Sequence, residues 1–260
     1  MSIVLAGVDG SAVSRDCLRA AVVLAELLAA APEAVYVGAA APPELLRLAA
    51  ATGVRLNCRP GRAGAALVEA LGAPEVAMGV LGSSGAGDTK VPQGRTAAAV
   101  MSASDKPLLI VPPGSFPPAQ RRLHRVLVPL DGRRESAQAV VPVLRQLAGA
   151  GLELVVVHVD DEDSIPSFSD AIAHETEGYA REFLMRYCPG APNASLELRL
   201  GVPTDEILGV VGQVAPQLLA IGWPQSPGPA RGMVARDLLN RSPIPLLLLS
   251  VGSGGAVFNS

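Results

Sequence analysis

The segment from Gly82 to Gly94 carries residues well suited to holding a phosphate group. Glycine lets the backbone adopt positive φ and approach a ligand closely, and consecutive amide groups in such a loop form a concave anion-binding nest. A predicted helix follows, and its N-terminus would add free N–H donors and a positive dipole end. This pattern predicts phosphate contacts from Gly82, Ser83, Gly85, Gly94, Arg95 and Thr96. The alternative is an exposed glycine-rich loop without a ligand.

The sequence leaves open the roles of three charged residues in or directly after this segment. Arg95 could clamp a phosphate in a bidentate pair, fill the space that a small residue leaves, or point into solvent. Asp88 could help to hold a magnesium–phosphate unit, and Lys90 could neutralise phosphate charge, although loop residues of these types are commonly solvated. The phosphate-loop pattern Gly-x4-Gly-Lys-(Ser/Thr) is absent.

A carboxylate, Asp9, follows the apolar run Ile3–Val8. At the end of a buried strand it would face the crevice where ligands of open α/β sheets bind. The alternative is local, because Asp-Gly-Ser ahead of a helix satisfies free N–H groups. Ser11 is then the predicted N-cap of a helix that begins there.

The chain contains this pattern twice. Residues 3–11 read Ile-Val-Leu-Ala-Gly-Val-Asp-Gly-Ser, and residues 125–132 read Arg-Val-Leu-Val-Pro-Leu-Asp-Gly, ending in Asp131-Gly132. A repeat of about 120 residues exceeds the period of solenoid proteins and has the size of a domain. We predict a first domain over 1–116, a second over 122–252 and a flexible tail over 253–260, with a proline-rich linker, Pro112–Arg122.

Short apolar runs alternate with helical segments in both domains. Strands are expected at Ile3–Val8, Val35–Val37, Val54–Cys58, Val76–Leu81, Leu108–Val111, Val126–Leu130, Leu152–Val159, Leu196–Leu200, Leu218–Ile221 and Ile244–Leu249. Helices are expected at Ser11–Ala30, Pro42–Ala51, Ala63–Leu71, Thr96–Ser102, Glu135–Leu147, Ser169–Tyr187, Pro203–Val214 and Gly232–Asn240. This order predicts a doubly wound parallel sheet in each domain, with ligands at the carboxyl ends of the strands.

The composition of the chain limits the classes of partner that are expected for it. Of 260 residues, 49% are hydrophobic and only 3% aromatic, so each domain's core must be built from Ala, Val and Leu. A net charge of −3 argues against nucleic acid as the main partner. No signal peptide and no apolar run of about 20 residues are visible, so no membrane is expected and the chain is predicted to be cytoplasmic.

The remaining reactive residues point to no catalytic centre. Cys17, Cys58 and Cys188 form no Cys-x-x-Cys pair; this is typical of a reducing compartment, and Cys17 and Cys58 are expected to be buried. His158 is expected to pack in the core rather than to bind a ligand. No metal-ligand spacing and no nucleophile beside a general base are present, so we predict no enzyme and no metal site.

The residues described above resemble the universal stress protein family, as a tandem of two domains. ATP-binding members carry Gly-x2-Gly-x9-Gly-(Ser/Thr) after the fourth strand and an Asp at the end of the first. Here Gly82, Gly85 and Gly94 match with one intervening residue fewer, and Arg95 stands where Ser or Thr is usual, beside Thr96. The resemblance implies flavodoxin-like (adenine nucleotide alpha hydrolase-like) domains with five parallel strands. It also implies ATP, with or without magnesium, as the ligand.

The resemblance also implies where the nucleotide would lie. Asp9 would lie near the adenine and ribose, Gly7 and Val8 would line the adenine side through backbone atoms, and Val37 would end the second strand beside them. In the second domain, Gln225 replaces the second glycine and Met233 the hydroxyl residue. We therefore expect one working site, in the first domain, and a degenerate, structural second domain.

Family members pair their last strands across a dimer. Here Leu108–Val111 and Ile244–Leu249 would pair within the chain as an intramolecular pseudo-dimer, and a further homodimer is a possibility that the sequence leaves open. The predicted function is that of an ATP-binding regulatory or stress-response protein. A nucleotide-independent stress-response scaffold or dimerisation module is the alternative, and slow ATP hydrolysis is a third possibility.

Overall fold

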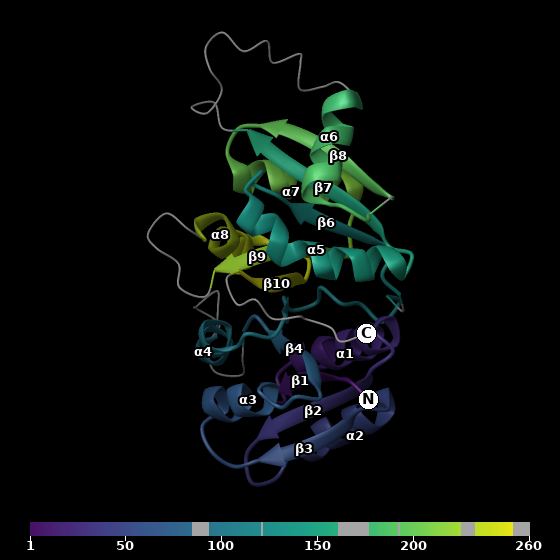
Figure 1. Ribbon diagram of the computed structural model, residues 1–260. Helices are drawn as coiled ribbons and strands as arrows, with labels where there is room; N and C mark the ends of the chain where they lie inside the picture. Colours follow the sequence, from purple (N-terminus) through teal and green to yellow (C-terminus); the bar gives the residue numbers. More distant parts are fainter. Residues whose placement is uncertain (85–93, 121, 161–176, 192, 225–231, 252–260) are drawn as a thin grey trace.

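A computed structural model describes residues 1–84, 94–120, 122–160, 177–191, 193–224 and 232–251 of the chain. Ten strands form one continuous sheet in the order β3-β2-β1-β4-β5-β10-β9-β6-β7-β8. The first domain supplies β1 to β5 and the second β6 to β10, so the two domains lie side by side along the sheet (Figure 1). None of the described helices is both long and apolar enough to cross a membrane.

The elements fall close to their predicted positions. The strands are β1 Ile3–Val8, β2 Ala31–Val37, β3 Arg55–Arg59, β4 Val76–Gly82, β5 Leu108–Val111, β6 Arg125–Pro129, β7 Glu153–Asp160, β8 Ala194–Leu200, β9 Leu218–Pro224 and β10 Leu246–Val251. The helices are α1 Val13–Leu27, α2 Pro43–Thr52, α3 Ala63–Leu71, α4 Arg95–Ala103, α5 Arg134–Gly149, α6 Glu177–Tyr187, α7 Pro203–Val214 and α8 Met233–Arg241. The predicted start of α6, at Ser169, lies outside the described residues.

Each domain has the doubly wound topology that its sequence predicts. The strand order is 3-2-1-4-5 in the first domain, and the second domain repeats it in mirror order along the sheet. All strand pairs within a domain are parallel. The predicted fold class is therefore confirmed, and the topological switch point of the first domain lies between β1 and β4.

The two domains join through their last strands. β5 pairs antiparallel with β10, with Leu109 opposite Leu247 at the centre of the register. All four residues of β5 are at most 2% exposed. An apolar strand of this kind would be a pairing hazard at a free edge, and the intrachain pairing removes that edge.

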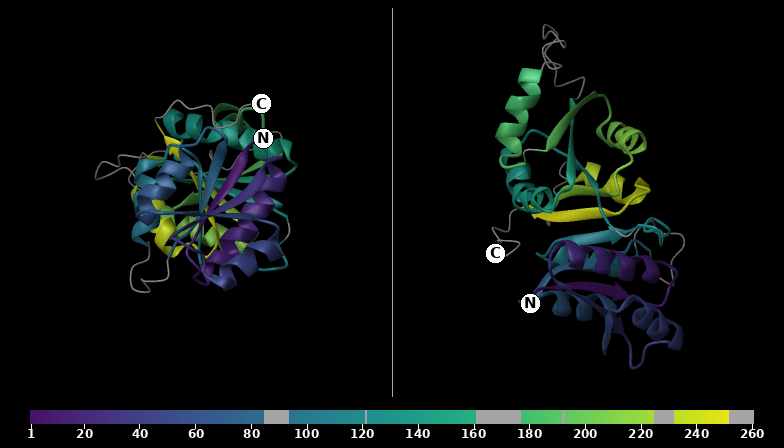
Figure 2. Two further views of the ribbon diagram at one scale, coloured as in Figure 1. Left: turned by 90° about the horizontal axis from the view of Figure 1, so that it is seen from below. Right: turned by 90° about the vertical axis from the view of Figure 1, so that its right-hand side faces the viewer.

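The hydrophobic cores are shared between the domains, whereas the sequence suggested one core for each. Helices cover both faces of the sheet (Figure 2). One cluster packs α1, α2, α5 and α6 against one face, and the other packs α3, α4, α7 and α8 against the opposite face. Each cluster therefore runs through both domains.

The linker is fixed to the first domain. Phe116 is 1% exposed and belongs to the core cluster under α1. The N–H of Gly114, whose φ of +74° suits glycine, donates to Asp16 Oδ2 at 2.7 Å. The buried carboxylate of Asp16 on α1 thus holds the start of the connection to the second domain.

Candidate functional site

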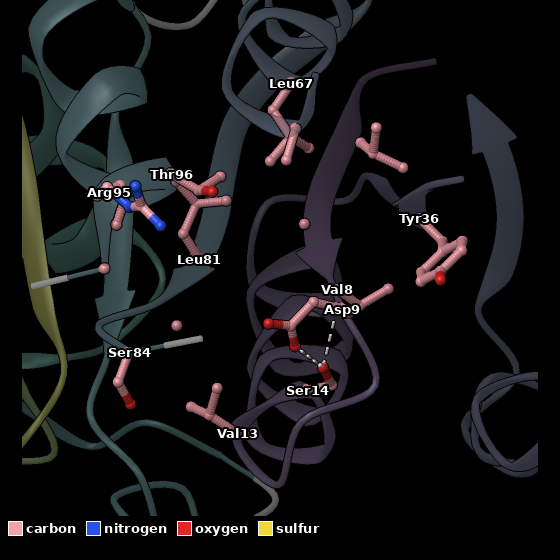
Figure 3. A pocket seen from close by; sticks show the side chains of 16 residues that line it. Val8, Asp9, Val13, Ser14, Tyr36, Leu67, Leu81, Ser84, Arg95 and Thr96 are labelled. Carbon is pink, nitrogen blue, oxygen red and sulfur yellow. Dashed lines mark hydrogen bonds between the residues drawn. The ribbon is translucent and has the colours of Figure 1, made fainter. Parts of the chain in front are cut away.

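A cavity of about 330 Å³ opens at the carboxyl ends of β1, β2 and β4, at the switch point of the first domain (Figure 3). This volume lies within the range of small-molecule sites. The cavity is lined by Gly7, Val8, Asp9, Val13, Ser14, Tyr36, Val37, Ala63, Leu67, Leu81, Gly82, Ser84, Gly94, Arg95, Thr96 and Ala97. Segments that are far apart in sequence, the turn after β1 and the two ends of the glycine-rich loop, therefore meet at one place.

Asp9 shapes the turn that leads from β1 into α1. Its Oδ1 accepts hydrogen bonds from the Ser11 N–H at 2.9 Å and from Ser14 Oγ at 3.1 Å. Ser14 Oγ in turn accepts from the N–H groups of Asp9 and Gly10, at 3.2 and 3.1 Å. The predicted N-cap role of Ser11 is wrong, because Ala12 is the N-cap and Ser14 satisfies the turn amides instead.

One end of the cavity is suited to an anion. α4 begins there, and Gly94 at its N-cap makes no side-chain cap hydrogen bond. The amides of Arg95, Thr96 and Ala97 have no acceptor inside the helix, since the first helical bond runs from Ala98 N–H to Gly94 O at 3.1 Å. The exposed Arg95 side chain adds a permanent positive charge beside these donors. Together they could bind a phosphate group.

The opposite end is apolar, with Tyr36 across the cavity from Arg95 (Figure 3). Val8, Leu67 and Leu81 line the space together with the Tyr36 ring. Peptide groups alternate in direction along a strand, and Ala31 N–H donates towards β1 whereas Gly38 N–H donates towards β3. The carbonyl oxygen of Val37 therefore points to the β1 side, beyond Val8, which is the last residue of β1 in this register. A flat heteroaromatic ring could pack here and use that backbone.

Two glycines keep the cavity open. A Cβ at Gly7 would lie 2.6 Å from Leu81 Cδ2 and 3.1 Å from both δ-carbons of Leu67. A Cβ at Gly82 would lie 2.5 Å from Val13 Cγ1 and 3.1 Å from the backbone oxygen of Ser84. The two shortest distances, 2.6 and 2.5 Å, are shorter than real Cβ contacts, so a larger residue at either position would have to displace a side chain that lines the cavity.

The structure brings together most of the predicted site residues. Ser83 is the exception: it is buried, its N–H donates to Val111 O at 3.0 Å and its carbonyl accepts from Gly94 N–H at 2.8 Å, so it joins the two ends of the loop while Ser84 lines the cavity. Gly85, Asp88 and Lys90 lie outside the described residues.

Sequence reasoning missed several lining residues, of which Ser14 and Tyr36 matter most. Ser14 could have been found from the repeat, because a serine follows the Asp of each Asp-Gly pair by five residues, at Ser14 and Ser136. Tyr36 stands next to the predicted Val37 and carries no motif. Leu67 and Leu81 are ordinary core residues in sequence, without any signal.

The corresponding place in the second domain keeps the turn but changes its surroundings. Asp131 Oδ1 accepts from Arg133 N–H and its Oδ2 from Ser136 Oγ, both at 3.0 Å. Pro129 stands in the place of Gly7, and His158 in the place of Tyr36, each 122 residues further along.

The His158 ring is tied down. Its Nδ1 lies 2.7 Å from Leu130 O and its Nε2 lies 3.3 Å from Asp160 Oδ1. Its Cε1 would be 3.4 Å from a Cβ at Gly132, and the centroids of the His158 and Phe183 rings are 4.9 Å apart. The predicted packing role of His158 therefore agrees with its contacts, although the side chain bonds to backbone at the end of the strand rather than lying among apolar residues only.

The cysteines offer no reactive thiolate beside the cavity. Cys17, on α1, is fully buried; burial, and then the charges of Asp16 and Asp9, raise the pKa of its thiol. Burial likewise raises the pKa of the Cys188 thiol to about 11. Cys58 is exposed on β3, which corrects the expectation that it is buried. Among the described residues no three His, Cys, Asp or Glu side chains gather as metal ligands would.

Comparison with known proteins agrees with this architecture. The sequence profile described as "Universal stress protein family" matches residues 122–250, which is the second domain. The first domain repeats the same topology and the same Asp-Gly turn. The chain therefore belongs to the universal stress protein family, as a tandem of two domains. A comparison with curated proteins gives no significant match.

Solved structures match the chain over its full length. A universal stress protein from Archaeoglobus fulgidus is similar with a TM-score of 0.66 at 16% identity, covering 96% of this chain and 98% of that one. A functionally unknown protein from Pseudomonas aeruginosa gives 0.68 at 12% identity, with 96% and 93% covered. A putative universal stress protein from the same species gives 0.67 at 14% identity, with 96% and 92% covered. At these identities the likeness establishes the fold alone.

Proposed function

We propose that the first domain binds an adenine nucleotide, such as ATP, and that the protein acts as a nucleotide-responsive regulatory or stress-response protein. The observation that carries this proposal is the division of one cavity into two ends. Arg95 and the first amides of α4 lie at one end, and Tyr36, Val37 and Leu67 at the other. An anionic group joined to a flat ring fits this division, and nucleotides have that composition.

We further propose that the second domain is structural. Pro129 in place of Gly7 adds ring atoms at the position where a Cβ in the first domain would already crowd two leucines. His158 is fixed by the Leu130 carbonyl and by Phe183, so its ring is not available to a ligand without breaking those contacts. The proposal is therefore one nucleotide per chain.

The most direct test is mass analysis of small molecules that accompany the purified protein, followed by calorimetric titration with ATP, ADP and AMP. The expected result is an adenine nucleotide with a stoichiometry of one per chain. Two equivalent sites would contradict the structural role of the second domain. No nucleotide in the preparation and no heat on titration would contradict nucleotide binding itself.

A nucleotide-independent scaffold is the second candidate, and the shared sheet favours it. The ten strands and both hydrophobic clusters continue across the two domains, so the two domains form one packed unit. The negative outcome of the titration above would support this candidate. We do not propose catalysis, because Asp9 is the one carboxylate among the described lining residues and its Oδ1 is engaged in the turn. Phosphate release from ATP that is lost in Asp9→Ala would contradict that view.

A further inference from the structure

The second domain contacts the helix that forms the anion end of the cavity. Trp223, on β9, donates a hydrogen bond from its indole Nε1 to the backbone oxygen of Met101, on α4, at 3.2 Å. These residues are 122 positions apart and belong to different domains. The boundary between the domains therefore lies next to α4 (Figure 1).

The bond lies where α4 needs a hydrogen-bond donor from outside the helix. The last four carbonyls of a helix have no donor within it. Ser104 N–H satisfies Val100 O at 2.9 Å, and Met101 O follows it in the last turn. The Trp223 indole thus caps α4 from the other domain.

Trp223 is itself firmly held. It pairs with Ser250 in the register of β9 with β10, and β10 pairs with β5. Its ring packs on the hydrophobic cluster that also contains Val100 and Met101, which are 0% and 2% exposed. The indole therefore fixes the end of α4 relative to the shared sheet.

Trp223 also occupies a position in the repeat that corresponds to a residue beside the candidate site of the first domain. Gly79 N–H donates to Pro107 O and Leu219 N–H donates to Pro245 O, so β4 and β9 correspond at these residues. Counting forward, Trp223 corresponds to Ser83, at the start of the glycine-rich loop. The second domain thus carries a large aromatic residue at the start of a loop that the first domain uses for its candidate site.

We propose that Trp223 is a positioning residue for the anion end of the first-domain site; this inference rests on the proposed nucleotide binding. α4 has nine residues, a length at which isolated helices are marginal, so its position depends on its tertiary contacts, and the Trp223 bond is one of these. Loss of the cap at Met101 shifts or loosens the helix, and Arg95, Thr96 and Ala97 move with it. The second domain, itself without a working site, would in this way tune the affinity of the first for phosphate.

The test compares Trp223→Phe, which keeps an aromatic ring but has no N–H donor, with wild-type protein in titrations with ATP, adenosine and inorganic phosphate. We expect ATP and phosphate to bind about two- to five-fold more weakly to the variant, on the scale of one hydrogen bond, and adenosine to bind equally. His158→Phe is the matched control, because it removes a bond from a side chain to a backbone carbonyl within the second domain, away from α4. It should leave all three affinities unchanged.

Trp223 is the only tryptophan of the chain, so wild-type protein gives a second readout. Its emission should change on addition of ATP but not of adenosine, and this measurement stands even where Trp223→Phe fails to fold. Equal affinities of Trp223→Phe and wild type, an equal loss for adenosine and ATP, or an emission that ATP leaves unchanged would overturn the inference while nucleotide binding stands. Wild-type protein that binds neither ATP nor adenosine would overturn the proposed function, and this inference with it.

Discussion

The turns after β1 and after β6 use the same residues, but the spaces beside them differ. In both, an aspartate accepts an N–H two residues later and a serine hydroxyl five residues later. Beside the first turn, Gly7 and Tyr36 border a cavity; beside the second, Pro129 and a bonded His158 stand at the same positions. The repeated Asp-Gly pair is therefore a feature of the fold, and a ligand site depends on what surrounds it.

The family signature and the cavity also fall in different domains. The family profile matches residues 122–250, whereas the described cavity with an anion end lies in the first domain. A sequence profile rewards the strands and turns that maintain a fold, while a cavity depends on a few small residues. In a duplicated protein, the domain that is easier to recognise need not be the one that binds.

The largest effect is expected from closing the first cavity. Gly7→Val should lower ATP affinity at least about 100-fold, because its Cβ already meets Leu81 and Leu67 and its methyl groups extend into the cavity. The counterpart Pro129→Gly should leave ATP affinity unchanged. Calorimetry measures both, with a circular dichroism spectrum to show that each variant is folded. Unchanged binding in Gly7→Val would place the ligand elsewhere.

The second-largest effect is expected from removal of the positive charge of Arg95 at the anion end of the cavity. Arg95→Ala is expected to weaken ATP binding about ten-fold, since a charge-assisted hydrogen bond is partly screened at an exposed side chain, and to leave adenosine binding unchanged. Met233→Ala, the corresponding change at the start of α8, should have no effect. Titration at two salt concentrations would show a smaller salt dependence in Arg95→Ala. Tighter ATP binding to this variant would show that Arg95 fills the phosphate space instead.

Tyr36 and His158, which stand at corresponding positions of the two domains, should also differ in their effect on nucleotide binding. Tyr36→Ala is expected to weaken binding of both ATP and adenosine about five-fold, because an aromatic wall for a base contributes on the order of 1 kcal/mol or more. His158→Ala should change neither affinity, although the loss of its bond to Leu130 O should lower the melting temperature slightly. Equal binding effects at the two positions would remove the distinction between the domains.

The smallest expected difference concerns the shared turns. Asp9→Ala and Asp131→Ala should each lower the free energy of unfolding by about 1 kcal/mol, because each removes an acceptor for a turn N–H and a serine hydroxyl. Chemical denaturation at pH 7 measures this. Only Asp9→Ala should also weaken ATP binding. A much larger loss of stability from Asp9→Ala would mean that its turn carries more of the fold than its counterpart does.

The sequence predicts this fold well because period and order determine it. In a chain of alternating strands and helices, a short apolar run such as Leu108–Val111 indicates a buried strand. The Asp-Gly repeat indicates the duplication. The sharing of cores across the domains depends on long-range pairing of β5 with β10, which local patterns do not encode.

The sequence predicts the site residues only where the residue type itself indicates a backbone conformation or a strand end. Glycines and the strand-end Asp9 are visible in sequence, and the structure places Gly7, Gly82 and Gly94 at the cavity. Ser83 and Ser84 are neighbours of the same type, and only the direction of the backbone decides which one faces the cavity. The backbone likewise decides that Ser14, and not Ser11, accepts hydrogen bonds from the turn. The bond of the Trp223 indole could not be predicted either, because its partner lies in the other domain.

Because β5 and β10 belong to one polypeptide, their association is intramolecular rather than bimolecular. Two separate chains that met through these strands would dissociate on dilution, whereas here the partner strand is always present at a high effective concentration. The pairing of β5 with β10 should therefore not depend on protein concentration. The same covalent link lets one crevice change without its counterpart, which a symmetric pair of identical chains does not permit.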